Sequence, residues 1–293
     1  MMNVSVIGAG VLGSALVIRL LECGFNVWVY NRTRCKLEEL IFSGARSIDD
    51  LDKAFVREKR IWLLCLRDES SIREVFSSNK IIEALKRHKF LMINTSTVGP
   101  KASARLEVFF KSVNVDYIEL PVSGGVEGAL SGGLIGYLGK SPECLKSDFD
   151  CVLRALLKAR CLMQSNQDAQ AMKVINNYCE AINLAVAAEA LLLAEAYGIS
   201  KEVIAGSLGL GRGRSMYLEL LLKWYMSAGH GITVPLEIRI KDLKLSGELF
   251  CDLNVQSRFY DGALELYEST LFSSSVALDQ MDCFGYLSGR TKG

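Results

Sequence analysis

Short apolar runs alternate with stretches of helical periodicity over the first 140 residues of the chain. Each run is four to six residues long and rich in Val, Ile, Leu and aromatic residues, as expected for strands buried on both faces. Helices between such strands predict a parallel sheet covered on both sides. The predicted strands are Asn3–Ile7, Asn26–Tyr30, Arg60–Cys65, Phe90–Asn94, Asp116–Glu119 and Leu134–Leu138. The predicted helices are Leu12–Cys23, Arg34–Ser43, Ile72–Phe76, Ile81–Lys89 and Ala102–Ser112.

The pattern changes near residue 164 and is helical from there on. Asp168–Tyr197 contains no Gly or Pro and stops at Gly198, which predicts one helix of about 30 residues, roughly 45 Å long. Further helices are predicted at Met216–Met226, Pro235–Leu249 and Asp261–Phe272. We therefore expect an α/β domain at 1–163, an interdomain helix at 164–198 and an all-helical C-terminal domain at 199–293.

Composition narrows the class of protein. The 293 residues carry a net charge of +1, which gives no field that would gather nucleic acid or an anionic membrane. Nine cysteines at irregular spacing and only two histidines argue against a metal site and against a disulfide framework. No apolar run reaches the roughly 18 residues of a membrane span. The expectation from composition is a globular cytoplasmic protein without a metal, nucleic-acid or membrane partner; the sequence motifs add a small-molecule substrate.

A glycine motif lies between the first predicted strand and helix. Gly8, Gly10 and Gly13 fit G-x-G-x-x-G, in which the first glycine makes a tight turn. The second glycine lets a pyrophosphate approach the backbone, and the third lets helix and strand pack closely. Amides at the helix N-terminus favour an anion. This setting predicts a dinucleotide-binding Rossmann domain, although a glycine-rich turn without a ligand has the same pattern.

The end of the second strand indicates which dinucleotide binds. NAD sites usually place Asp or Glu there to bind the ribose 2′-hydroxyl. This chain instead has Asn31, Arg32, Thr33 and Arg34. A guanidinium can donate two hydrogen bonds to a phosphate, so NADP(H) is favoured over NAD. The alternative is that both arginines are solvated charges at the start of a helix.

Lys173 and Asn177 lie one turn apart on one face of the long predicted helix, with Asn176 beside that face and Glu180 two turns on. Apolar neighbours indicate a partly buried helix, where a lysine needs a partner or a task. An ammonium can stabilise and protonate the alkoxide formed when a carbonyl is reduced. From the helix alone, an ordinary lysine on a helix surface is the stronger interpretation.

A second polar segment follows the strand Asp116–Glu119. Ser123, Gly124 and Gly125 offer a hydroxyl and bare amides that suit a carboxylate at the sheet edge. Taken alone, this segment is a turn that contains a serine.

Together these segments resemble the β-hydroxyacid dehydrogenase family, which includes 3-hydroxyisobutyrate dehydrogenases. Six segments carry the resemblance in the family's order: Gly8–Gly13, Asn31–Thr33, Asn94–Val98, Pro121–Gly125, Lys173–Asn177 and Lys241–Leu243. The resemblance implies a Rossmann domain, a long interdomain helix and a helical C-terminal domain like that of 6-phosphogluconate dehydrogenase. It also implies a homodimer or homotetramer.

The resemblance also implies roles for individual residues. Lys173 would be the catalytic acid, Asn177 would support it, and Ser123, Gly124 and Gly125 would hold a substrate carboxylate. Lys241 would close over the nicotinamide, with Asp242 positioning it; the alternative for this pair is a surface ion pair. The implied cofactor contacts come from Gly8, Gly10, Val11, Leu12, Gly13, Asn31, Arg32, Thr33, Cys65, Leu66, Thr95, Ser96 and Lys241.

Several positions depart from the family pattern. Gln167 and Ala169 stand where the family has Gly-x-Gly before the catalytic helix, so that side chains there either narrow the entrance or tighten the helix start. Arg67 replaces a Pro, and Glu119 replaces the usual Asp. The role of Glu180 stays open among a second acid, a partner of Lys173 and a solvated charge.

The hypothesis that follows is an NADPH-dependent reductase of a semialdehyde or keto acid, with Lys173 as general acid. One alternative is an imine or specialised-metabolite reductase of the same fold, against which the presence of Lys173 argues. Another is a dinucleotide-binding scaffold without catalysis, which would need neither Ser123 nor Lys173 nor Asn177.

Overall fold

The computed structural model describes residues 2–57, 61–140, 148–227 and 232–290. The chain divides into two compact units, Met1–Lys173 and Val174–Gly293. Arg60, with which the third predicted strand begins, lies outside the described residues. Each helix in the described ranges is too short or too polar to cross a bilayer.

A six-stranded sheet forms the centre of the first unit, in the order β3-β2-β1-β4-β5-β6 with all neighbours parallel. The strand order reverses beside β1, and ligands of open α/β sheets bind at the carboxyl ends of strands at such a point. The strands are β1 (Asn3–Ile7), β2 (Asn26–Tyr30), β3 (Arg46–Ser47), β4 (Ile61–Leu64), β5 (Leu91–Asn94) and β6 (Asp116–Glu119).

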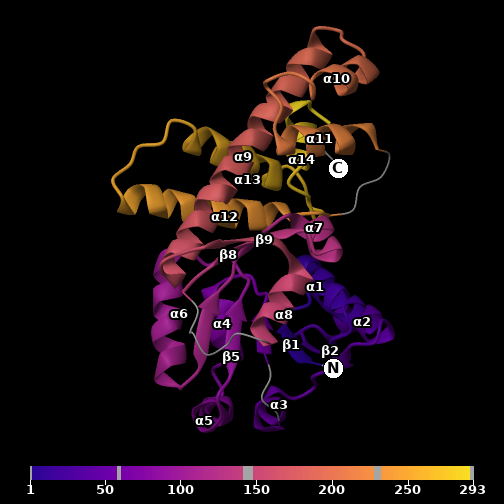
Figure 1. Cartoon of the computed structure of the whole chain (residues 1–293). Helices are drawn as coiled ribbons and strands as arrows, with labels where there is room; N and C mark the ends of the chain where they lie inside the picture. The colour runs from indigo at the N-terminus through magenta and orange to yellow at the C-terminus, as the bar shows by residue number, and fades with distance from the viewer. Residues whose placement is uncertain (1, 58–60, 141–147, 228–231, 291–293) are drawn as a thin grey trace. The chain divides into compact units, whose positions relative to one another are not determined.

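Helices cover both faces of this sheet, so the predicted fold class is confirmed (Figure 1). Residues of β4 alternate between the two cores: Leu63 packs with one, Trp62 and Leu64 with the other. The first core also takes side chains from α1 (Val11–Glu22), α2 (Glu38–Phe42), α7 (Gly125–Ser131) and α8 (Asp148–Leu156). The second takes them from α3 (Leu51–Arg57), α4 (Glu69–Val75), α5 (Asn79–Arg87) and α6 (Pro100–Ser112).

The predicted strand Leu134–Leu138 forms, but in a second sheet. As β8 it pairs antiparallel with β7 (Val122–Ser123) and parallel with β9 (Leu157–Leu162). Only two residues separate β6 from β7, whereas a parallel neighbour needs a crossover of about a dozen residues. The chain therefore turns out of the main sheet at Pro121.

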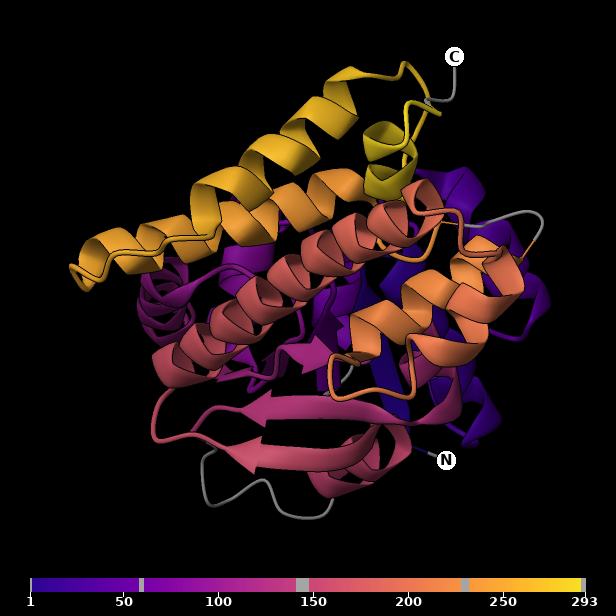
Figure 2. The same ribbon diagram turned by 90° about the horizontal axis from the view of Figure 1, so that it is seen from above.

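The second unit is helical, as predicted. It begins within α9 (Asn166–Ala196), a helix of 31 residues that matches the predicted long helix within two residues at each end. Two helices of this unit, α12 and α13, pack side by side (Figure 2). The helices after α9 are α10 (Lys201–Ser207), α11 (Met216–Met226), α12 (Leu236–Asp252), α13 (Tyr260–Phe272) and α14 (Asp282–Leu287).

Candidate active site

The glycine turn joins β1 to α1 at the point where the strand order reverses. Gly8 has a φ of +107°, and a Cβ atom there would lie 2.1 Å from the carbonyl oxygen of Cys65. A Cβ atom on Gly13 would lie 2.0 Å from the carbonyl oxygen of Gly8. Neither position has room for a side chain, so these two glycines let β1, α1 and the end of β4 pack together.

Gly10 is different from the other two glycines, because a Cβ atom there would meet nothing within 4 Å. It is the N-cap of α1, no side chain caps the helix, and the first turn carries no acidic residue. The first amides of a helix have no partner within it and attract an anion. The open backbone at Gly10 therefore fits the pyrophosphate of a dinucleotide.

Asn31 lies at the carboxyl end of β2 and braces the glycine turn. Its Oδ1 accepts a hydrogen bond of 3.0 Å from the amide of Ala9, and its Nδ2 donates to the carbonyl of Thr33 at 2.9 Å. The segment after β2 is thus held to the pyrophosphate-binding turn by hydrogen bonds of the Asn31 side chain.

Arg32 projects into solvent from the same segment. Its Nη1 lies 3.0 Å from an oxygen of Glu74, and four-fifths of the Arg32 side chain is exposed. Arg34 pairs with Asp49 at 3.2 Å. Exposed ion pairs contribute at most about 1 kcal/mol, so either guanidinium can exchange its carboxylate for a phosphate at little cost.

The segments after β4 and β5 are tied together. Ser96 Oγ accepts a hydrogen bond of 2.9 Å from the amide of Leu66, and Thr95 Oγ1 donates to the carbonyl of Leu64 at 2.8 Å. Burial raises the pKa of the Cys65 thiol to about 11, so this cysteine is a neutral side chain and not a nucleophile. Contact of these residues with a cofactor stays a prediction.

Ser123, Gly124 and Gly125 follow β6, as the sequence indicated, but they are not part of the main sheet. Ser123 is the last residue of β7 in the small sheet, and Gly125 opens α7. Gly124 and Gly125 are exposed, with φ of +129° and +62°. A Cβ atom on Gly125 would meet nothing within 4 Å, which leaves its backbone accessible.

Lys173 is buried, with 7% of its surface exposed, two turns into α9. Gln170, one turn earlier, is fully buried and hydrogen-bonded to the segment that follows β5. The interpretation of Lys173 as an ordinary solvated lysine is therefore wrong.

Two side chains of the second unit are held by one carboxylate. Asn177 Nδ2 donates to Asp242 Oδ2 at 2.7 Å, and Lys241 Nζ lies 2.7 Å from Asp242 Oδ1. The side chains of Lys241 and Asp242 are only 19% and 10% exposed. The pair is not the surface ion pair that we considered as an alternative, and Asp242 fixes the orientation of both partners.

Glu180 is not solvated. It accepts hydrogen bonds from Asn176 Nδ2 at 2.6 Å, Tyr217 OH at 2.8 Å and Arg239 Nη2 at 3.0 Å. Arg239 is 2% exposed and also donates to the carbonyl of Asn177 and to Gln280 Oε1. This buried cluster fixes α9 against α12. Its arginine was missed because an arginine on a helix is usually exposed.

Glu119 was noted as a departure from the family pattern, but its burial was missed. It is fully buried at the end of β6, and burial raises its pKa from 4.5 to about 7, although hydrogen bonds from Tyr117 and Gln170 oppose the change.

Gln167 Nε2 donates to Glu107 of α6 at 2.7 Å, and Ala169 is fully buried. The Gln167 side chain therefore tightens the helix start against α6.

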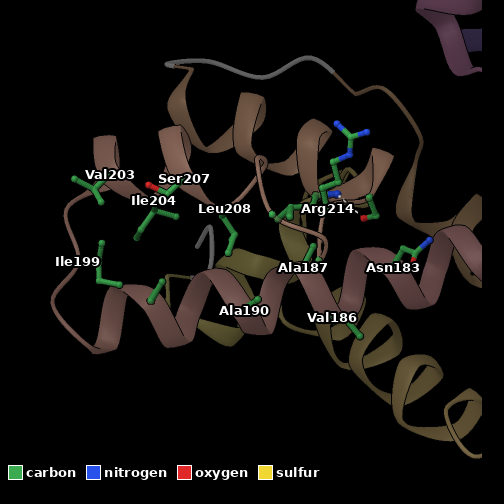
Figure 3. Close-up of a pocket in the computed structure, with 15 residues that line it drawn as sticks. Asn183, Val186, Ala187, Ala190, Ile199, Val203, Ile204, Ser207, Leu208 and Arg214 are labelled. Atoms are coloured by element: carbon green, nitrogen blue, oxygen red, sulfur yellow. Dashed lines mark hydrogen bonds between the residues drawn. The ribbon is translucent and has the colours of Figure 1, made fainter.

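A hollow of about 580 Å³ lies in the second unit between α9, α10 and the segment before α11 (Figure 3). Mostly apolar side chains line it, among them Val186, Ile204 and Leu208, with Arg214 at one end. It contains none of the predicted site residues.

A parallel sheet with a glycine turn whose open backbone suits a pyrophosphate defines a dinucleotide-binding protein. Family models support this over both parts of the chain. Residues 3–162 match the NAD-binding domain of 6-phosphogluconate dehydrogenase, and residues 168–287 match a model described as NAD-binding of NADP-dependent 3-hydroxyisobutyrate dehydrogenase. The chain belongs to the β-hydroxyacid dehydrogenase family and is an NAD(P)-dependent oxidoreductase of that type.

Individual relatives agree over most of the chain. The 2-(hydroxymethyl)glutarate dehydrogenase of Eubacterium barkeri is 24% identical over 267 residues, which cover 91% of this chain and 88% of that protein. The cytokine-like nuclear factor N-PAC of Homo sapiens is 26% identical over 281 residues, 96% of this chain but 49% of N-PAC. A structure of Psf3 in complex with NADP+ and 2-OPP superposes with a TM-score of 0.90 and 29% identity, covering 97% of this chain and 100% of Psf3.

Proposed function

We propose that the protein reduces a small carbonyl compound that carries an acidic group, using NADPH, with Lys173 as the general acid. The observation that carries the proposal is the burial of Lys173 on α9. Gln170, one turn earlier on this helix, is hydrogen-bonded to the segment that follows β5. A buried ammonium at this place can stabilise and protonate an oxygen that gains negative charge during reduction.

Each group has a distinct part in the reaction. NADPH, when bound, supplies the hydride. Lys173 stabilises the negative charge on the carbonyl oxygen and gives it a proton. Asn177, one turn further on α9, supports that lysine. Ser123 and the backbone of Gly124 and Gly125 hold the acidic group of the substrate.

The preference for NADPH rests on the segment after β2. The position that takes an acid in NAD sites is occupied by Asn31, whose amide braces the glycine turn. Arg32 stands exposed beside it and can bind a 2′-phosphate. NADP+ in the complex of the 29% identical Psf3 supports this choice. Reduction is the favoured direction because cells generally keep the NADP pool reduced.

Two broader features remain proposals. An acid-bearing substrate agrees with the name of the Eubacterium barkeri relative, a dehydrogenase of a hydroxymethyl dicarboxylate. We also propose a homodimer or homotetramer, in which residues 1–163, 164–198 and 199–293 act as the cofactor domain, the interdomain helix and the C-terminal domain.

Oxidation of NADPH, followed by absorbance, tests the proposal with a panel of semialdehydes, keto acids and cyclic imines. Turnover of acid-bearing carbonyls is the expected result. Turnover of imines alone would replace it with an imine reductase. Tight NADPH binding with no turnover on any compound would indicate a scaffold.

A further inference from the structure

The side-chain amide of Gln170 accepts two hydrogen bonds and donates two. Its Oε1 accepts hydrogen bonds from the amides of Val98 and Gly99, at 3.0 Å and 3.1 Å. Its Nε2 donates to the carbonyl of Ser96 at 2.8 Å and to Glu119 Oε2 at 2.7 Å. All four bonds are buried. Three of the four partners belong to Ser96–Gly99, the segment that follows β5 and precedes α6.

The fourth partner, Glu119, fixes the direction in which the amide faces. Asn94 Nδ2 donates to its Oε2 at 2.9 Å, and Tyr117 OH donates to its Oε1 at 2.6 Å. Asn94 and Tyr117 both donate to this carboxylate, and the Gln170 amide likewise presents its NH₂ group to Glu119. Its oxygen is thereby turned towards the two backbone amides.

We propose that Gln170 is a positioning residue, which sets the distance between Lys173 and the segment Ser96–Gly99 through its four hydrogen bonds. The inference rests on the proposed function. Lys173 lies three residues after Gln170 on the same helix, so movement of the Gln170 backbone moves the lysine with it. An error of about 1 Å in the placement of a catalytic group can lower a rate on the order of 10²-fold.

Gln170→Met keeps the length and burial of the side chain and removes all four hydrogen bonds. We expect kcat to fall roughly 10²-fold, because Lys173 loses its placement. Affinity for NADPH, which depends on the glycine turn, should change by less than about threefold, a small effect on the scale of binding energies. Gln167→Met is the matched control from the same helix end, because its amide bonds Glu107 of α6 and not the segment Ser96–Gly99. Its kcat should fall much less than that of Gln170→Met.

A readout without cofactor or substrate is amide hydrogen exchange. The amides of Val98 and Gly99 donate to Gln170 in the wild type and should be protected. In Gln170→Met they should exchange at least about tenfold faster, because the free energy of one lost hydrogen bond corresponds to about a tenfold change in the opening equilibrium. In Gln167→Met they should stay protected. Equal protection in all three proteins overturns the proposal.

Gln170→Glu adds a test by pH in case the Met variant does not fold. A carboxylate cannot donate to Ser96 or Glu119, whereas a protonated carboxyl donates to one of them and still accepts from the two amides. The kcat of this variant relative to wild type should therefore rise as pH falls. The titratable groups around the site are Glu119 and Tyr117 on β6 and, near Tyr117, Glu107 on α6.

The outcomes separate this proposal from the proposed function. No turnover by the wild type on any compound overturns both. Turnover by the wild type, with an unchanged kcat in Gln170→Met, overturns the positioning role alone. A ratio of Gln170→Glu to wild type that does not depend on pH also overturns it.

Discussion

Gly10 and Gly13, two glycines of the pyrophosphate-binding turn, should respond to alanine in opposite ways. A methyl group on Gly13 would lie 2.0 Å from the Gly8 carbonyl oxygen, so the backbone must move. Overpacking of this kind costs about 1–3 kcal/mol of folding free energy. Gly10 has a φ of −77°, which suits alanine, and its methyl group would meet no protein atom within 4 Å. Gly10→Ala should change the free energy of unfolding by less than about 1 kcal/mol, since loss of a glycine N-cap and gain in chain stiffness oppose each other.

Gly10→Ala, which we expect to fold normally, should nevertheless bind the cofactor more weakly. The methyl group of Gly10→Ala occupies the space that a pyrophosphate needs, so NADPH affinity should fall at least about tenfold, or about 1.4 kcal/mol. Urea unfolding followed by circular dichroism gives the stability of both variants, and quenching of tryptophan fluorescence gives the affinity. If Gly10→Ala is as unstable as Gly13→Ala, the steric argument is wrong. If Gly10→Ala binds NADPH as the wild type does, the turn is not a pyrophosphate site.

Three further predictions concern charged groups. Arg32→Asp should reduce the preference for NADPH over NADH by about 1–3 kcal/mol, the value of a charged hydrogen bond; equal affinities in the wild type would contradict the assignment. Arg239→Met should cost about 3–5 kcal/mol in urea unfolding, because it leaves the Glu180 carboxylate without its buried cation; a loss below about 1 kcal/mol would refute this role. Burial raises the pKa of Glu119 from 4.5 to about 7, so its contribution to stability is full below pH 4.5 and is lost as pH rises through 7. The difference in unfolding free energy between wild type and Glu119→Gln should therefore fall across that range, and a constant difference would contradict the shift.

The sequence predicted those parts of the fold that local patterns determine. The apolar strands of the main sheet, the glycine turn and the long helix were all placed within two residues, because period and punctuation mark them. The strand β9 was missed, since its sequence Leu-Lys-Ala-Arg-Cys-Leu has no apolar face and it is mostly exposed. Its pairing with β8 supplies the strand structure that its own residues do not encode.

The buried polar groups were not predictable in the same way. Glu119, Gln170 and Arg239 are ordinary polar residues in sequence, and their burial depends on partners that are 40 to 75 positions away for most of their bonds. Only the fold brings those donors and acceptors together. Lys173 was predictable only in part: its apolar neighbours indicated a partly buried helix, but the helix alone favoured an ordinary surface lysine.

Hydride transfer from NADPH in a single turnover, compared between wild type and Lys173→Met, tests the central role of this buried lysine. Both proteins are first saturated with NADPH, whose affinity should be nearly equal in the two. The account predicts that the transfer rate falls by roughly 10²–10⁴, the usual contribution of general acid catalysis. A transfer rate in Lys173→Met equal to that of the wild type would contradict it.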